Sequence, residues 1–135
     1  MFVTFTVDGR PVPKGRPRVT RHGTYTPRST QEFERRVRKA WEESGASRFP
    51  DGAALSLTVF AHFPIPKSAP KKRRVQLNGA PHTAARGDID NIVKSVMDAL
   101  NGCAYADDSC ISRITASKSY LESPSTTVII TEAET

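Results

Sequence analysis

The strongest structural signal in this sequence is the alternation of apolar and polar side chains over residues 53–63. Leu55, Leu57 and Val59 occupy every second position, with Ser56 and Thr58 between them. Because successive side chains of a β-strand point to opposite faces, this pattern predicts a strand with one buried face. The remaining elements must therefore supply neighbouring strands and a cover for that face.

Other segments provide these elements. Residues 2–8, 109–119 and 125–132 are predicted strands, and a turn at 122–124 joins the last two. Apolar residues at helical spacing predict a first helix that starts near Ser29, with a Ser29–Glu32 capping box, and ends near Gly45. A second helix is predicted over 89–101, ending at Asn101-Gly102. The order β-α-β-α-β-β predicts an α/β (α+β) fold, with residues 1–135 forming a single domain that has a mixed sheet and two main helices.

Two segments have no apolar periodicity. Residues 9–29 are rich in proline, glycine and arginine, and these prolines argue against a helix or a central strand. We expect an extended surface segment there. Residues 64–87 contain four prolines and are predicted to be a long irregular loop.

The charge of the chain favours a polyanionic partner. The formal net charge is +6 and the pI is about 9.7. Basic residues crowd two runs, one at 10–28 and one at 67–74, whereas acidic residues gather between Asp88 and Asp108 and in the tail at Glu132 and Glu134. Phosphates attract lysine and arginine and release counterions on binding, so a basic surface around an acidic focus suits a nuclease.

The same composition disfavours other classes of protein. No stretch approaches the length of about 20 apolar residues that a membrane-spanning helix needs. The N-terminus lacks the features of a signal peptide, which predicts a cytoplasmic protein of a bacterial or phage-infected cell. Cys103 and Cys110 lack zinc-site spacing and are predicted to be reduced thiols.

The acidic segment at 88–108 contains the candidate catalytic residues. Asp88 and Asp90 stand at the start of the second predicted helix, Lys94 lies one turn further on the same face as Asp90, and Asp107-Asp108 follow the exit loop. Carboxylate oxygens are the ligands that Mg²⁺ prefers. The residues also allow plainer roles: helix caps for the first two aspartates, a turn for the second pair, and an i, i+4 ion pair between Lys94 and Asp98.

Three strings together resemble the RusA-type Holliday junction resolvases, which are common in phages and prophages. They are PVPKGRPRVTRHGTYTP, DIDNIVKSVMDALNG and YADDSCI. The resemblance implies a homodimeric, Mg²⁺-dependent enzyme that nicks two opposed strands of a four-way DNA junction. Arg86-Gly87 departs from the Lys-Pro or basic run that precedes the first aspartate in many relatives.

The resemblance also assigns roles to residues. It implies that Asp88, Asp90 and Asp108 are metal ligands and that Lys94 is the essential lysine, with Asp107 and Asn91 in support. DNA backbone contacts would come from Lys14, Arg16, Arg18 and Lys118, although Lys118 also fits an ordinary solvated strand lysine.

The sequence therefore predicts a Mg²⁺-dependent, junction-resolving endodeoxyribonuclease, a phosphodiester hydrolase of DNA recombination and repair. Two alternatives remain open at this point. One is a nuclease for other branched DNA, and the other is a non-catalytic basic DNA-binding module in which the aspartates are structural.

Overall fold

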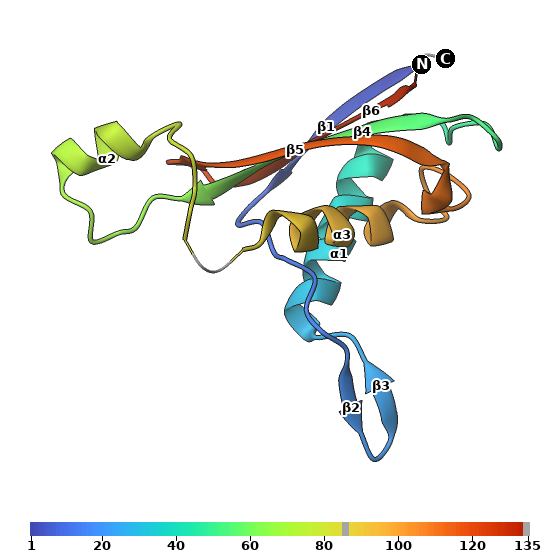
Figure 1. Ribbon diagram of the computed structural model, residues 1–135, viewed down its shortest axis with the longest axis horizontal. Helices are drawn as coiled ribbons and strands as arrows, with labels where there is room; N and C mark the ends of the chain where they lie inside the picture. Colours follow the sequence, from blue (N-terminus) through green and yellow to red (C-terminus); the bar gives the residue numbers. More distant parts are fainter. Residues whose placement is uncertain (85–86, 134–135) are drawn as a thin grey trace.

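The computed structural model describes residues 1–84 and 87–133. Its centre is a four-stranded sheet in the order β1-β6-β4-β5 (Figure 1). The pairs β1–β6 and β4–β6 are antiparallel, whereas β4 and β5 are parallel, so the predicted mixed sheet is confirmed. The strands are β1 (Phe2–Asp8), β4 (Leu55–Pro64), β5 (Ile111–Leu121) and β6 (Ser125–Glu132).

Two helices, α1 (Arg28–Glu43) and α3 (Ile89–Leu100), lie on the same face of this sheet (Figure 1). The alternating residues of β4 point toward them: Leu55, Leu57 and Val59 are almost fully buried. Phe5 of β1 meets Trp41 of α1 edge to face, with ring centroids 6.2 Å apart. Each large apolar side chain buried in this way contributes about 1.5–3 kcal/mol, so the core fixes α1 and α3 against the sheet.

The strand β5 sets the geometry of the site. In register with β4, Leu57 pairs with Ile114, Val59 with Ala116, and Ala61 with Lys118. Paired residues share a face, so these β5 side chains lie on the side of the sheet that carries the helices. The strand begins after the loop that leaves α3 and runs back along that helix, since the Nζ atom of Lys118 donates to the carbonyl oxygen of Gly87, just before α3 begins, at 3.1 Å.

The predicted start of the first helix is wrong in detail. The capping box at Ser29 does not form: α1 begins at Arg28, with Pro27 at the N-cap and no side-chain cap hydrogen bond. Ser29 is already inside the first turn, and Glu32 pairs with Arg28 instead, at 3.2 Å between Oε1 and Nε. The proline fixes the helix start because its φ suits the position that precedes a helix.

The two segments without periodicity contain more structure than the sequence predicts. Part of the extended segment at 9–29 forms a hairpin of β2 (Arg18–Thr20) and β3 (Gly23–Tyr25), which projects from the body (Figure 1). Part of the loop at 64–87 forms α2 (Lys71–Leu77). Neither element has a buried residue, so an apolar pattern could not reveal them. No helix among the described residues is long and apolar enough to cross a membrane.

Candidate metal and DNA site

The start of α3 presents two exposed carboxylates. Asp88 is the N-cap residue of α3, but its side chain makes no capping hydrogen bond. Asp90, in the first turn, accepts a hydrogen bond at Oδ1 from the backbone N–H of Asn91 at 2.9 Å. A helix-capping role therefore explains part of the environment of Asp90, but it does not explain the side chain of Asp88. Both carboxylates face solvent and can receive a cation.

Lys94 lies one turn along α3, and its Nζ atom is 3.1 Å from Oδ1 of Asp98. Asp98 also contacts Lys14, with 3.0 Å between Oδ2 and Nζ. The same ammonium lies 3.0 Å from Oε1 of Glu34 on α1. The plainer reading of Lys94 and Asp98 as an ion pair is thus present, and Asp98 is shared by two lysines.

This network changes the environment of Lys14. Its side chain points between α1 and α3 and is 21% exposed, whereas contact with DNA backbone needs an accessible ammonium. Burial acts to lower the pKa of Lys14, but hydrogen bonds to Asp98 and Glu34 outweigh it and raise the pKa. Lys14 therefore joins the two helices in this structure, and its contact with DNA remains a prediction.

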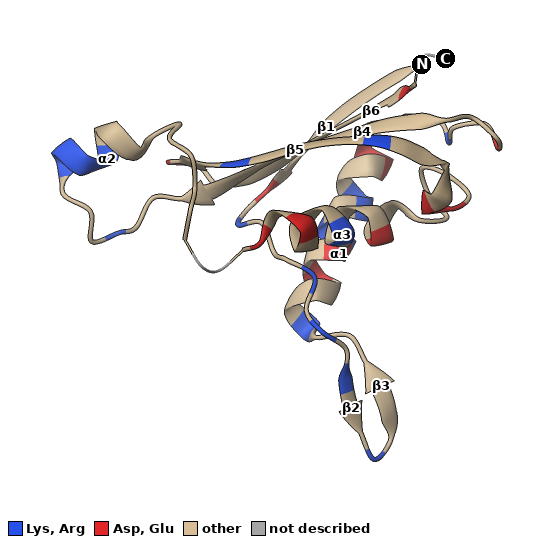
Figure 2. Cartoon of the chain, in the orientation of Figure 1, with Lys and Arg blue, Asp and Glu red and all other residues tan. Residues whose placement is uncertain are grey.

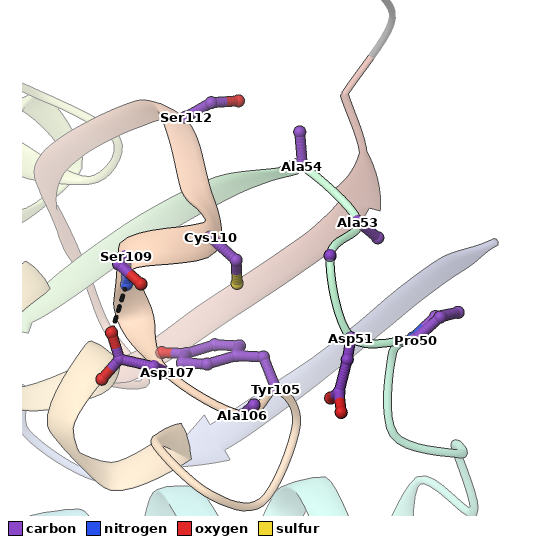
Figure 3. A pocket seen from close by; sticks show the side chains of 11 residues that line it. Pro50, Asp51, Ala53, Ala54, Tyr105, Ala106, Asp107, Ser109, Cys110 and Ser112 are labelled. Atoms are coloured by element: carbon purple, nitrogen blue, oxygen red, sulfur yellow. Dashed lines mark hydrogen bonds between the residues drawn. The ribbon is translucent and has the colours of Figure 1, made fainter.

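The second pair of aspartates lies where β5 begins. Asp107 precedes the short 3₁₀ helix η1 (Asp108–Cys110), and its Oδ2 atom accepts from the backbone N–H of Ser109 at 3.1 Å (Figure 3). This hydrogen bond lowers the pKa of Asp107. Asp108 is half-buried and lies near Tyr105, whose pKa is raised by burial and then by the charge of Asp108. A pocket of about 410 Å³ adjoins Asp107, between the 50–54 loop and residues 105–112.

The two pairs of aspartates lie at opposite ends of α3. Acidic residues mark both ends of this helix in Figure 2. The helix has 12 residues, and a rise of 1.5 Å per residue separates its ends by about 18 Å. The phenol of Tyr105 donates to the carbonyl oxygen of Met97 at 2.8 Å, which holds the Asp108 end beside the last turn of α3. The predicted ligands Asp88, Asp90 and Asp108 therefore do not meet within one chain.

The acidic, histidine and cysteine side chains of the described residues agree with this geometry. No group of three His, Cys, Asp or Glu side chains in residues 1–84 and 87–133 is placed to hold a metal ion. The strand β5 does double back along α3, but it brings Lys118 to the start of the helix and leaves Asp108 at the end. The sequence departs from the family pattern at Arg86-Gly87, just before the first aspartate. Arg86 lies outside the described residues, and Gly87 has a φ of +95°.

An open groove lies between α3 and β5. It has a volume of about 410 Å³ and is lined by Ile89, Asp90, Val93, Lys94, Met97, Ile114 and Ala116. Asp90 and Lys94 share this surface, as their spacing predicts, but Val93 and Met97 of the apolar stripe lie there too. Ile114 is 48% exposed. Sequence reasoning missed this groove because nothing in the alternation of β5 shows that its edge is uncovered.

Of the remaining predicted DNA contacts, Lys118 is half-buried, whereas the two arginines are accessible. Arg16 and Arg18 are exposed, and Arg18 begins the projecting hairpin β2–β3. The basic run at 71–74 forms most of α2 and projects from a different part of the body (Figure 2). Between Ile65 and Gly87 the sequence contains no Asp or Glu. The two basic runs thus form two separate cationic projections.

Comparison with known proteins defines the class. The family model described as Endodeoxyribonuclease RusA matches residues 8–131, nearly the whole chain, which includes α1, α3, β4, β5 and the four candidate aspartates at 88, 90, 107 and 108. The chain belongs to this family of nucleases. A curated relative, the "Uncharacterized protein YqaN" of Bacillus subtilis (strain 168), is 34% identical over 137 residues, covering 96% of this chain and 96% of the relative.

Proposed function

We propose that residues 1–135 form one Mg²⁺-dependent, structure-selective endodeoxyribonuclease domain that resolves four-way DNA junctions by paired, symmetric nicks. Membership of the RusA family supports the nuclease class and a branched-DNA substrate. The observation that carries the proposal in this chain is the pair of acidic ends on α3, in a molecule that also presents two cationic projections, the β2–β3 hairpin and α2 (Figure 2). The setting would be recombination and repair of prophage or host DNA.

The separation of the aspartates favours a site built from two subunits. A two-fold axis perpendicular to a helix or strand relates two copies of that element in antiparallel orientation. Pairing two α3–β5 surfaces in this way would bring the Asp88–Asp90 end of one copy to Asp108 of the partner subunit. The groove beside Ile114 supplies an apolar surface for the contact, and the 111–117 edge of β5 lacks a neighbouring strand in the described chain.

Such a homodimer also fits the substrate. A four-way junction has approximate two-fold symmetry, so two identical sites would face two equivalent strands. Each site would have an intact pair of carboxylates at one helix start and one further carboxylate from the other subunit. A monomer would then have the residues for cleavage without the arrangement that cleavage needs.

The donor set suits Mg²⁺, which takes carboxylate oxygens together with water and phosphate. A bound Mg²⁺ would lower the pKa of a water molecule and offset the charge that develops on the phosphate. Asp88, Asp90 and Asp108 would hold the ion, with Asp107 beside it and Asn91 supporting the helix start. Lys94, on the same surface as Asp90, would stabilise the charge of the phosphate in the transition state. Attack of that water on the phosphorus, in line with the departing 3′-oxygen, would leave 5′-phosphate and 3′-hydroxyl ends.

The direct test is cleavage of an immobile four-way junction and of a linear duplex of the same sequence, each with Mg²⁺ and with EDTA. We expect paired nicks on the junction alone, dependent on Mg²⁺. Equal cutting of a flap substrate would instead indicate a nuclease for other branched DNA. Tight binding without any cutting would indicate a non-catalytic DNA-binding module, and the aspartates would then be caps and turns.

A further inference from the structure

A second, mainly apolar groove opens next to Asp88. It has a volume of about 450 Å³ and is lined by Arg10, Pro11, Val12, Pro13, Phe63 and Gly87. Gly87 directly precedes Asp88, so the groove adjoins one of the proposed metal ligands. Its size lies within the range of small-molecule sites, and its walls are prolines, an aliphatic side chain and an aromatic ring.

Two cations flank this groove. The guanidinium carbon of Arg10 lies 5.8 Å from the ring centroid of Phe63, within cation–π range. Within the described residues, Arg10 has no acidic partner at ion-pair distance. Lys118 uses one N–H for the carbonyl oxygen of Gly87, and its other two ammonium donors have no hydrogen-bond partner among residues 1–84 and 87–133. Burial and then the charges of Lys118 and Arg10 lower the pKa of His82, which stacks on Phe63 behind the groove.

The walls of the groove are fixed before any ligand arrives. The Nη1 atom of Arg36 donates to the carbonyl oxygen of Asp8 at 2.6 Å, which anchors the chain where it leaves β1. The backbone N–H of Lys14 donates to the carbonyl oxygen of Asn91 at 2.8 Å, which ties the segment to α3. On the other wall, Phe63 stacks on His82 with ring centroids 4.1 Å apart.

Gly87 lets the two walls come close together. Its φ of +95° is a conformation that side-chain-bearing residues rarely adopt. A Cβ atom at this position would also lie 2.7 Å from Cζ of Phe63. The groove, its cations and the start of α3 therefore form one rigid surface.

We propose that this groove binds one nucleotide of the DNA strand that passes Asp88. Arg10 and Lys118 would bind its phosphate, while Val12 and Pro13, the partly exposed apolar residues of the groove, would contact its sugar and base. Cations beside an apolar wall match a nucleotide, which joins an anionic phosphate to a flat, largely apolar base. That this strand is the one cleaved rests on the proposed function; the binding itself does not require cleavage.

The test combines Arg10→Gln with DNA that lacks single phosphate charges. Immobile four-way junctions, each with one neutral methylphosphonate, are titrated with wild type and variant in EDTA. Neutral groups should weaken wild-type binding at each contacted phosphate, and at the phosphate bound by Arg10 the loss should be about tenfold, as for loss of one charged hydrogen bond. Arg10→Gln should bind the unmodified junction about tenfold more weakly and lose nothing further at that position. Lys39→Gln on α1, whose partner Glu43 is also exposed, is the matched control and should retain the wild-type profile.

A junction with an abasic nucleotide at the same position tests the apolar part of the groove. Wild-type affinity should fall severalfold, and an unchanged affinity would overturn the contact with the base. If Arg10→Gln and wild type respond alike at every methylphosphonate, the phosphate contact is wrong. Cleavage in Mg²⁺, measured in parallel, separates the groove proposal from the proposed function. If the wild type cuts junctions but Arg10→Gln and the methylphosphonate have independent effects, only the groove proposal is rejected. If their effects are coupled but no junction is cut, only the nuclease function is rejected.

Discussion

At the residue scale, the site depends on where the fold places each aspartate along α3 and β5. Spacing predicts that Asp88 and Asp90 share the start of a helix, and the structure places them there. Spacing does not predict the direction in which the chain returns after α3. Because β5 runs back along α3, Lys118 reaches Gly87 while Asp108 stays at the far end. That outcome depends on strand pairing, which a local pattern cannot encode.

The first prediction concerns Asp90. Asp90→Asn keeps the size of the side chain but removes a proposed metal ligand, and even residues that only support a ligand change activity or affinity by about 10–100-fold. We expect junction cleavage in Mg²⁺ to fall by at least about a hundredfold, while junction binding in EDTA stays equal or improves because a negative charge near phosphate is lost. Asp8→Asn, an exposed aspartate on β1, is the control and should cleave normally. Wild-type cleavage rates for Asp90→Asn would remove Asp90 from the site.

The second prediction concerns Asp98 and acid stability. Burial acts to raise the pKa of Asp98, but hydrogen bonds from Lys14 and Lys94 outweigh it and lower the pKa. A lowered folded-state pKa contributes stability that is present above the unfolded-state pKa and is lost as the pH falls through the folded-state pKa. We therefore expect the free energy of unfolding of wild type to fall more steeply below about pH 4 than that of Asp98→Asn.

Urea unfolding at several pH values between neutral and acid measures this difference. The two proteins should also differ at neutral pH, where Asp98→Asn leaves Lys14 with Glu34 as its acidic partner. Parallel pH profiles would show that the contacts of Asp98 with Lys14 and Lys94 contribute nothing to folding. Glu43→Gln, from an exposed pair with Lys39, should match wild type at every pH.

At the element scale, the segments that carry an apolar face were predictable and the ones without it were not. The strands β1, β4, β5 and β6 and the helices α1 and α3 all bury a periodic face, and all were found within a few residues. The hairpin β2–β3 and the helix α2 contain no buried residue, so the sequence showed only their charges and the prolines of the segments around them. Both elements instead display cations, which supports a role in binding DNA phosphate.

The third prediction concerns α2. Lys71, Lys72 and Arg73 are exposed and belong to a helix without buried residues. Replacing all three with glutamine should leave the fold unchanged and weaken junction binding. If each contacts a phosphate, the log–log slope of affinity against salt should become about 2–3 units less steep. Arg74 is left in place because its Nη1 atom holds the carbonyl oxygen of Pro66 at 3.0 Å.

Binding titrations at several salt concentrations test this, with Lys39→Gln as the control for loss of a distant charge. An unchanged slope in the triple variant would place α2 away from DNA. Comparison with Arg16→Gln/Arg18→Gln would then show whether the hairpin alone carries the contact.

At the scale of the whole molecule, the sequence predicted the class of fold and the family resemblance implied a dimer, but neither indicated a surface through which two copies could meet. The groove between α3 and β5 becomes visible only when the sheet is assembled and Ile114 is left 48% exposed at its edge. Two features then require the same explanation: an uncovered apolar surface, and carboxylates at opposite ends of the helix that borders it. The proposed two-fold pairing across α3 and β5 would account for both.

The most direct test of this shared site is complementation between two inactive variants. In a mixed dimer of Asp90→Asn and Asp108→Asn subunits, a shared site leaves one of the two sites with all its carboxylates, whereas a site within one chain leaves none. The subunits are co-expressed with different tags, the mixed dimer is purified, and nicking of a four-way junction is measured in Mg²⁺. A mixed dimer of Asp90→Asn with Asp90→Asn/Asp108→Asn is the control, since neither arrangement gives it an intact site. We expect the first mixed dimer to nick one strand and the control to be inactive; if both are inactive while wild type cuts, the metal site is not shared between subunits.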